Sequence, residues 1–183
     1  MKTGVGDGLL LKAGVARGRI TPPAGVELTG YAGRPGPSAG VHDELYATAI
    51  VLDEGATRAA IVSLDLLGLG FDQDARLRSA IATAAGIDGR NLLIASSHTH
   101  GGPATQTLRE CGTEDECYLR WAFSQITMTA QKAAESLAPA AVSVARGESD
   151  LAWNRRNWVI DQGVQASPTS GVVTDPEVLS LII

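Results

Sequence analysis

Aromatic residues and cysteine are scarce in this chain, and each shortage narrows the class of protein it can be. Aromatic side chains make up 4% of the 183 residues, so the core must be built mostly from Ala, Val, Leu and Ile. The two cysteines, Cys111 and Cys117, are too few for a disulfide-stapled scaffold. Their spacing is not that of a zinc knuckle, so two free thiols are expected, with a disulfide between them as the alternative.

Long apolar runs and an excess of positive charge are also missing. No apolar run reaches the roughly 18 residues needed to cross a bilayer. Residues 1–12 hold one apolar block, Leu9–Leu11, which is too short for a signal peptide, and we expect this segment to be disordered. The chain as written is therefore expected in the cytoplasm, or outside the cell if its true start lies upstream. The formal net charge of −5 argues against nucleic acid or an anionic membrane surface as the main partner.

What the chain does contain is an alternation of strand and helix patterns. Its 44% hydrophobic content and its length suffice for one domain over residues 1–183. Extended segments are expected at 13–22, 45–52, 59–64, 91–94, 141–145 and 178–183, with a hairpin turn at 53–58 and loops at 30–41 and 161–174. Strands interleaved with helices predict an α/β fold, a mixed β-sheet flanked by helices. The apolar ending at 178–183 indicates the N-terminal part of a larger catalytic domain.

A first helix is predicted after residue 71. Leu77, Ile81 and Ala84 recur on one face of it, which is the spacing of an amphipathic helix. Asp72 is expected to cap its N-terminus, because its carboxylate can accept the free backbone N–H groups there. Gly86 is expected to end it, since glycine readily adopts the left-handed conformation of a helix C-terminus.

A second and longer helix is predicted before residue 139. Thr113 and Glu116 have the spacing of a capping box, in which each side chain bonds a backbone N–H of the other. Apolar residues keep the helical period from Leu119 to Leu137, and Pro139 is expected to stop the helix.

Residues 95–103, Ala-Ser-Ser-His-Thr-His-Gly-Gly-Pro, form the most informative segment. Two of the three histidines, His98 and His100, follow the strand pattern at 91–94 with one residue between them. On a strand that spacing points both rings to one face. Neutral imidazole is the commonest nitrogen ligand of zinc, so the motif offers one or two metal ligands, or one ligand and one acid–base group. Cross-strand packing or plain surface exposure is the alternative, because a catalytic zinc needs three protein ligands and no third is nearby.

This motif resembles the Thr-His-Thr-His-Ser-Gly-Pro signature of the neutral/alkaline, non-lysosomal ceramidase family, which are zinc amidases that hydrolyse N-acylsphingosine. Further segments resemble that family in the same order along the chain, at 14–22, 30–32, 40–47, 62–65, 154–156 and 175–178. The resemblance spans nearly the whole chain, and the histidine motif is its most specific part. The sequence departs from the signature at Gly101, where the family has a serine.

Carried over by position, the resemblance implies roles for three residues. His98 would ligate one zinc ion, His100 would contact the substrate, and Arg155 would hold the carbonyl oxygen or the product carboxylate. The other ligands, a second histidine, a glutamate and a tyrosine, would lie beyond residue 183. Zinc lowers the pKa of its bound water to about 7. A second imidazole and a guanidinium can stabilise the negative oxygen that forms on the amide carbonyl.

For several other residues the sequence alone leaves a functional role and a structural role open. Asp65, at the end of the strand predicted at 59–64, could orient a histidine through its free ring N–H or could cap the strand. Arg155 taken alone would be a surface arginine, and His42 is expected in a loop or in packing. Trp153 and Trp158, on either side of Arg155, could pack the loop or line a lipid groove.

The sequence therefore predicts a zinc-dependent amidohydrolase that acts on a lipid or small-molecule amide of the ceramide type. One alternative is an enzyme of the same scaffold that acts on another acylated amine. A second is a ceramidase-like binding module without chemistry. The 183-residue chain alone is expected to be inactive, because it supplies only one of the family's zinc ligands.

Overall fold

The structure is a computed structural model that describes residues 11–152, 156–159, 163–166 and 174–183. The chain forms two compact units, Met1–Ala140 and Ala141–Ile183, which are described separately here. The prediction of one domain over residues 1–183 stays a prediction. No helix in the described ranges is long and apolar enough to span a bilayer.

A five-stranded mixed sheet forms the first unit, in the order β4-β3-β2-β1-β5. Its strands are β1 (Lys12–Arg19), β2 (Tyr46–Asp53), β3 (Arg58–Leu64), β4 (Leu92–Ser96) and β5 (Ala138–Pro139). β3 and β4 are parallel, and the other neighbouring pairs are antiparallel. The predicted hairpin at 53–58 joins β2 to β3. The fold class predicted from the sequence, a mixed sheet with helices, is confirmed.

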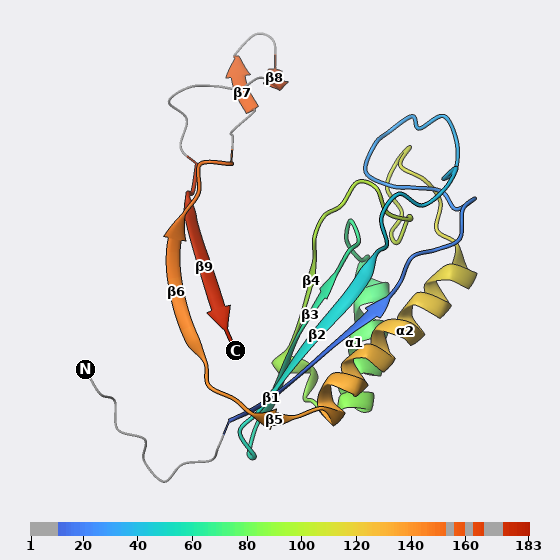
Figure 1. Cartoon of the computed structure of the whole chain (residues 1–183). Coiled ribbons are helices and arrows are strands. Elements are labelled where there is room, and N and C mark those ends of the chain that lie inside the picture. Colours follow the sequence, from blue (N-terminus) through green and yellow to red (C-terminus); the bar gives the residue numbers. More distant parts are fainter. Residues whose placement is uncertain (1–10, 153–155, 160–162, 167–173) are drawn as a thin grey trace. The chain divides into compact units, whose positions relative to one another are not determined.

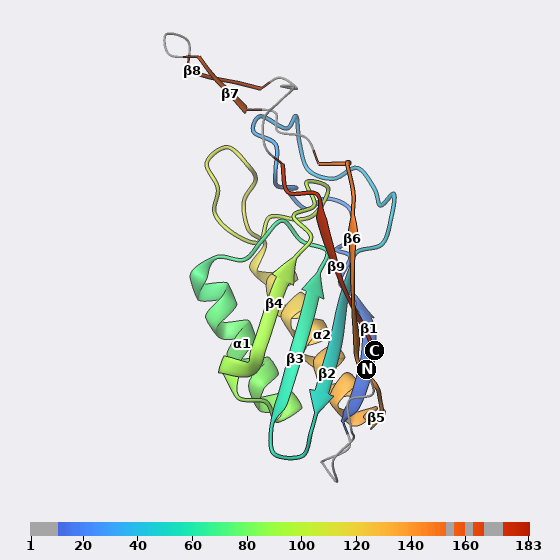
Figure 2. The same ribbon diagram turned by 90° about the vertical axis from the view of Figure 1, so that its left-hand side faces the viewer.

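Both helices of this unit, α1 (Phe71–Ala85) and α2 (Glu116–Glu135), pack on the same face of the sheet (Figures 1 and 2). Strand residues that point to this face are buried, as in β2, where Ala47, Ala49 and Val51 alternate with partly exposed neighbours. On the opposite face Val15 and Leu93 are each 57% exposed. The hydrophobic core of the unit therefore lies between its sheet and its helices.

The first helix begins and ends close to where the sequence predicts. Gly86 ends α1 in the left-handed conformation, with φ +64°, as expected. The N-terminal prediction was wrong: Gly70 occupies the cap position without a side-chain hydrogen bond, and Asp72 lies within the first turn. Leu77 and Ile81 are buried as predicted, but the third buried position is Ala85.

Helix α2 begins at a different cap from the predicted one. The carboxylate of Asp115 accepts hydrogen bonds from the backbone N–H groups of Cys117 and Tyr118, at 2.8 and 3.0 Å, so Asp115 caps the helix instead of Thr113. Its apolar face is buried along its length, at Tyr118, Leu119, Ala122, Phe123, Ile126, Ala130 and Ala133. The helix ends at Glu135, four residues before the proline expected to stop it.

Small residues let β1 approach this helix closely. A Cβ atom added at Gly14 would collide with the carbonyl oxygen of Ala133, and one at Gly18 would collide with the hydroxyl of Thr129. The glycines at these two positions therefore set the distance between β1 and α2.

The second unit consists of two strand pairs. β6 (Ser143–Glu148) pairs antiparallel with β9 (Glu177–Ile182), and β7 (Arg156–Val159) pairs antiparallel with β8 (Gly163–Ala166). The two predicted strands at 141–145 and 178–183 are present with shifted bounds. The prediction of a continuous loop over 161–174 was wrong at residues 163–166, which form β8.

Candidate active site

Three loops meet at one end of the five-stranded sheet. Residues 20–45 connect β1 to β2, residues 65–70 follow β3, and residues 97–115 follow β4 and carry the histidine motif. The backbone N–H of Ser97 donates to Leu64, and that of His98 donates to Leu66, at 2.9 and 3.0 Å. These hydrogen bonds continue the β3–β4 pairing past the ends of the two strands. They bring His98 to the end of the sheet where the three loops meet.

His98 is held in a defined ring orientation. Its Nδ1 lies 2.9 Å from the carbonyl oxygen of Leu67. Because a carbonyl only accepts hydrogen bonds, Nδ1 carries the proton, and in the neutral ring Nε2 keeps its lone pair free. A backbone carbonyl on the second ring nitrogen is the usual arrangement for a metal-binding histidine.

The histidines do not lie on a strand, so the predicted geometry was wrong although the pair does meet. β4 ends at Ser96, and His98 has φ +60°, a left-handed conformation. The two rings nevertheless approach edge to face, with centroids 5.0 Å apart and planes inclined by 74°. The turn in the backbone at His98, and not strand alternation, places His100 beside it.

Residues from the 20–45 loop surround His100. Tyr31 lies edge-on to its ring at 5.0 Å between centroids. Gly30, with φ +98°, lies so close that an added Cβ would come within 2.5 Å of the His100 ring. Two backbone hydrogen bonds join the 20–45 loop to the histidine loop. The N–H of Thr29 donates to the carbonyl of Gly102, and that of Ala104 donates to the carbonyl of Glu27, each at 3.0 Å.

Arg34 completes this group of side chains. Its Nη2 donates a short hydrogen bond to the backbone carbonyl of His100, and its guanidinium carbon lies 5.1 Å from the centroid of the Tyr31 ring. Sequence reasoning missed Tyr31 and Arg34 as site residues, because the 30–41 segment has no periodicity. The segment's Gly-Tyr-Ala run, noted for its resemblance, was the available signal for Tyr31.

Asp65, a predicted partner of a histidine ring, contacts another part of the chain. The carboxylate of Asp65 accepts a hydrogen bond from the backbone N–H of Tyr46 at 2.9 Å, so Asp65 joins the end of β3 to the start of β2. The partner of the His98 ring is the Leu67 carbonyl instead. Arg155 lies outside the described residues, as does Trp153.

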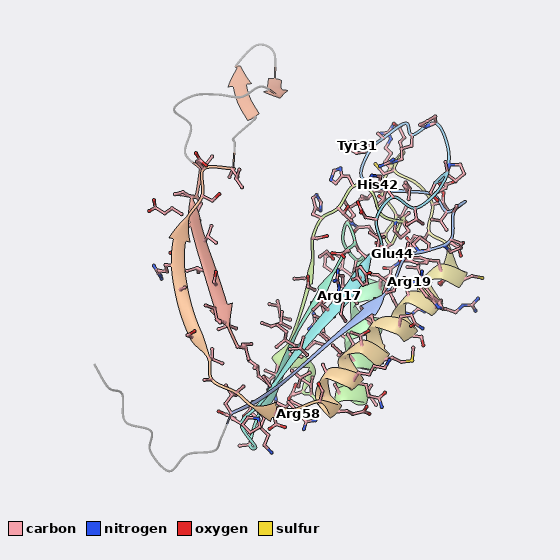
Figure 3. All side chains as sticks on the ribbon, viewed as in Figure 1. Arg17, Arg19, Tyr31, His42, Glu44 and Arg58 are labelled. Atoms are coloured by element: carbon pink, nitrogen blue, oxygen red, sulfur yellow. The ribbon has the colours of Figure 1, made fainter. Side chains whose placement is uncertain are left out.

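Charged side chains at this end of the sheet pair mostly with their neighbours. His42 is exposed in its loop, with Nδ1 2.7 Å from the carboxylate of Asp43. A hydrogen bond from Thr21, and then one from Arg19, hold the pKa of the Glu44 carboxyl below its usual value of 4.5. Tyr31, His42 and Glu44 lie towards the loop end of the sheet, and Arg58 lies at the opposite end (Figure 3).

No cluster of three or more His, Cys, Asp or Glu side chains suited to a metal occurs in the ranges that the structure describes. Cys111 and Cys117 are both free thiols. The two motif histidines stay the predicted metal-binding group among the residues that the structure describes.

Two hollows lie among these loops, and residues of the histidine motif line the smaller of them. One, of about 330 Å³, lies between Thr99, Gly101 and Pro103 of the motif and the loop residues Val41 and Leu45. The other, of about 680 Å³, lies between the 27–37 segment and residues 107–113, and Arg34 lines it.

Comparison with known proteins finds similarity to neutral ceramidases. The neutral ceramidase of Drosophila pseudoobscura pseudoobscura is 36% identical over 98 residues, and that of Drosophila melanogaster is 34% identical over 96 residues. The crystal structure of neutral ceramidase from Pseudomonas aeruginosa matches with a TM-score of 0.74 and 22% identity, over 94% of this chain. The chain contains a neutral ceramidase-like region. A structure described as a ceramidase complexed with C2 also matches the region, with a TM-score of 0.72, 20% identity and 94% coverage of this chain.

The ceramidase-like region corresponds to a part of these proteins. Each Drosophila alignment covers 50% of this chain and 14% of the relative, and the two structural matches cover 29% and 28% of the solved chains. No family model matches the chain. The fold is that of a portion of a ceramidase, which agrees with the predicted partial domain.

Proposed function

We propose that the protein hydrolyses the N-acyl linkage of ceramide-type lipids, N-acylsphingosine being split into sphingosine and a fatty acid, with one zinc ion as cofactor. The ring orientation of His98 is the observation that carries this proposal. Its hydrogen bond to Leu67 leaves Nε2 as a lone-pair donor at the sheet edge, where the three loops meet. The likeness to neutral ceramidases supports the reaction class.

The residues of this chain fit one part of a zinc site. His98 would hold the ion through Nε2, with Leu67 fixing the ring, and further ligands would come from other parts of the protein. Bound zinc would supply a Lewis acid and an activated water. His100, which Tyr31 and Gly30 hold beside His98, would contact the amide, and Arg155 would bind the carbonyl oxygen or the carboxylate product.

Replacing each histidine tests the division of roles. In the complete protein, His98→Ala should lose zinc, because the variant lacks the ligand. His100→Ala should keep zinc and lose most turnover, because it lacks only the substrate contact. Metal content by atomic spectroscopy and ceramide hydrolysis measure the two effects. Equal loss of zinc in both variants would contradict the assignment, and unchanged turnover in both would remove the histidines from the reaction. A wild type that binds ceramide without hydrolysing it would favour a binding module.

Arg155 provides a second test. Arg155→Lys should lower kcat/KM by about 10²-fold, as for the removal of an oxyanion donor, because an ammonium lacks the planar fork of a guanidinium. Arg156→Lys, the neighbouring substitution of the same type, serves as the matched control and should retain the rate. A near-normal rate for Arg155→Lys would remove Arg155 from the mechanism.

A further inference from the structure

Exposed apolar side chains gather at the end of the sheet where the three loops meet. They are Tyr31 and Val41 of the loop after β1, Phe71 at the start of α1, Leu108 of the histidine loop, and Trp121 near the start of α2. These five residues form the loop-end apolar group, and Figure 3 shows Tyr31 at this end. Single exposed apolar side chains are ordinary, but several at one place often mark an interaction surface.

Phe71 is the most exposed member of this group. The residue is 98% exposed, whereas the buried face of its helix is formed by Leu77, Ile81 and Ala85. Phe71 therefore contributes almost nothing to the core. Transfer of a phenylalanine ring from water to apolar surroundings is favourable by an amount that changes a binding constant about tenfold or more.

Trp121 and Val41 lie around one hollow of this surface. Together with Pro22 and Pro23 they line a space of about 490 Å³. Val41 also lines the smaller hollow beside the histidine motif. Tryptophan and tyrosine favour the boundary between water and acyl chains, because each has an apolar body and one polar group. The composition of the loop-end apolar group therefore suits the surface of a lipid bilayer.

The charges at this end of the sheet are balanced. The ion pairs here are Arg19–Glu44, Arg76–Glu116 and Arg109–Glu110, with nitrogen–oxygen distances of 3.2, 3.7 and 3.5 Å. The described lysines, Lys12 and Lys132, lie at the opposite end, where β1 begins and α2 ends. Anionic membranes attract clusters of unpaired Lys and Arg, so this surface fits a zwitterionic bilayer better than an anionic one.

We propose that the loop-end apolar group docks onto a zwitterionic lipid bilayer. Its side chains enter the boundary between headgroups and acyl chains, and the histidine pair then faces the depth at which the amide of a ceramide-type lipid lies. The proposal rests on the proposed function only for the lipid that is hydrolysed, because docking itself requires no reaction.

Partition of the complete protein onto phosphatidylcholine vesicles, measured by sedimentation, tests the docking. The wild type should bind, and Phe71→Ser should bind about tenfold more weakly, because the ring is no longer transferred from water. Since Phe71 is almost fully exposed, the variant should keep the urea midpoint of the wild type. Phe71→Trp should bind at least as tightly as the wild type. A wild type that stays in solution, or unchanged binding of Phe71→Ser, would overturn the proposal.

Leu93→Ser is the matched control, because it removes an exposed apolar side chain from the open face of the sheet. It should partition like the wild type, and a loss equal to that of Phe71→Ser would refute a docking surface at the loop end. Phosphatidylserine in the vesicles should not strengthen binding, since the charges here are balanced. Binding that requires phosphatidylserine and disappears at high salt would contradict the zwitterionic partner.

Two substrates separate docking from the reaction. Phe71→Ser should hydrolyse ceramide in phosphatidylcholine vesicles about tenfold more slowly than the wild type, because less of it is bound. It should hydrolyse short-chain N-acetylsphingosine without vesicles at the wild-type rate, and equal losses on both substrates would overturn the docking role. If the wild type hydrolyses neither substrate, the proposed function fails, and the vesicle partition of Phe71→Ser and Leu93→Ser still decides whether the surface docks.

Discussion

At the scale of the residue, Gly30 is one determinant of the position of the His100 ring. It has a positive φ of +98°, and a Cβ at this position would lie 2.5 Å from the imidazole ring. We predict that Gly30→Ala lowers stability by more than the cost of about 1–2 kcal/mol of a left-handed alanine, and also displaces the ring of His100. Urea unfolding and the ring resonances of the histidines in NMR spectra measure the two effects.

Gly33 provides the matched control in the same loop. Its φ is also positive, at +70°, but an added Cβ there would meet no atom within 4 Å. Gly33→Ala should therefore show the backbone cost alone, with unchanged histidine resonances. If both variants lose the same stability and leave the resonances unchanged, the contact with His100 does not constrain the site.

The two histidines of the candidate site could be selected from the sequence, but Tyr31, Arg34 and the contacts among these residues could not. His98 and His100 could be selected because their segment is distinctive in the sequence. The hydrogen bond from His98 to Leu67 joins residues 31 positions apart, and the one from Arg34 to His100 joins residues 66 positions apart. No local pattern encodes such contacts, because they depend on how the loops after β1, β3 and β4 come together.

At the scale of the element, the N-terminus of α2 offers a direct test of its cap. Asp115→Ala should lower stability by about 1 kcal/mol, because two backbone N–H groups lose their acceptor. Thr113→Ala replaces the residue that the sequence pattern favours and should cost less than about 0.5 kcal/mol. Chemical unfolding of both variants makes the comparison, and a larger loss for Thr113→Ala would restore the capping-box assignment.

The hairpin between β2 and β3 has an acid-sensitive ion pair. Asp53 accepts hydrogen bonds from Nε and Nη2 of Arg58 at 3.0 and 2.7 Å and from the backbone of Gly55 at 2.7 Å. The Arg58 side chain, and then the Gly55 N–H, hold the pKa of Asp53 below its usual value of 3.8. Folding thus favours the ionised form, and its contribution to stability is complete above the pKa of the unfolded chain.

We predict that this contribution disappears as the pH falls through the lowered pKa of Asp53. Asp53→Asn should lower the urea midpoint at neutral pH, and the difference from the wild type should narrow as the pH falls below 3.8. Glu54→Gln removes the same charge one residue further along the turn without those hydrogen bonds. A gap between Asp53→Asn and the wild type that stays constant from neutral pH to acid would contradict the prediction.

Periodicity and turn residues accounted for most elements, whereas caps and pairings needed the tertiary structure. The alternation in residues 45–52 and 59–64 predicted β2 and β3 to within one or two residues. The sequence did not single out Asp115 because aspartate at 115 and threonine at 113 are both acceptable caps. The hydrogen bond from the Thr113 N–H to Glu27 distinguishes the two positions, and it exists only in the folded chain. The pair β7–β8 was missed because Gly, Ser and Thr dominate its surroundings.

At the scale of the whole molecule, the number of candidate zinc ligands limits the zinc affinity and the activity expected of the 183-residue chain alone. We predict that it binds zinc weakly and hydrolyses no amide, because two histidines supply at most two of the three protein ligands that a catalytic zinc uses. Equilibrium dialysis with zinc and an amide hydrolysis assay test this. Tight, stoichiometric zinc in a monomeric sample would mean that further ligands lie within the chain, and Asp43, Glu44 and Asp65 would be the first to replace.

Contacts between distant segments also determine when the site can form during folding. The hydroxyl of Tyr118 donates to the carbonyl of Ile20 across 98 positions of sequence, and the N–H of Thr113 donates to Glu27 across 86. Closing such long loops is slow compared with forming a hairpin such as β2–β3. We predict that the histidine loop acquires its geometry late in folding. Substitutions there should alter the unfolding rate more than the folding rate.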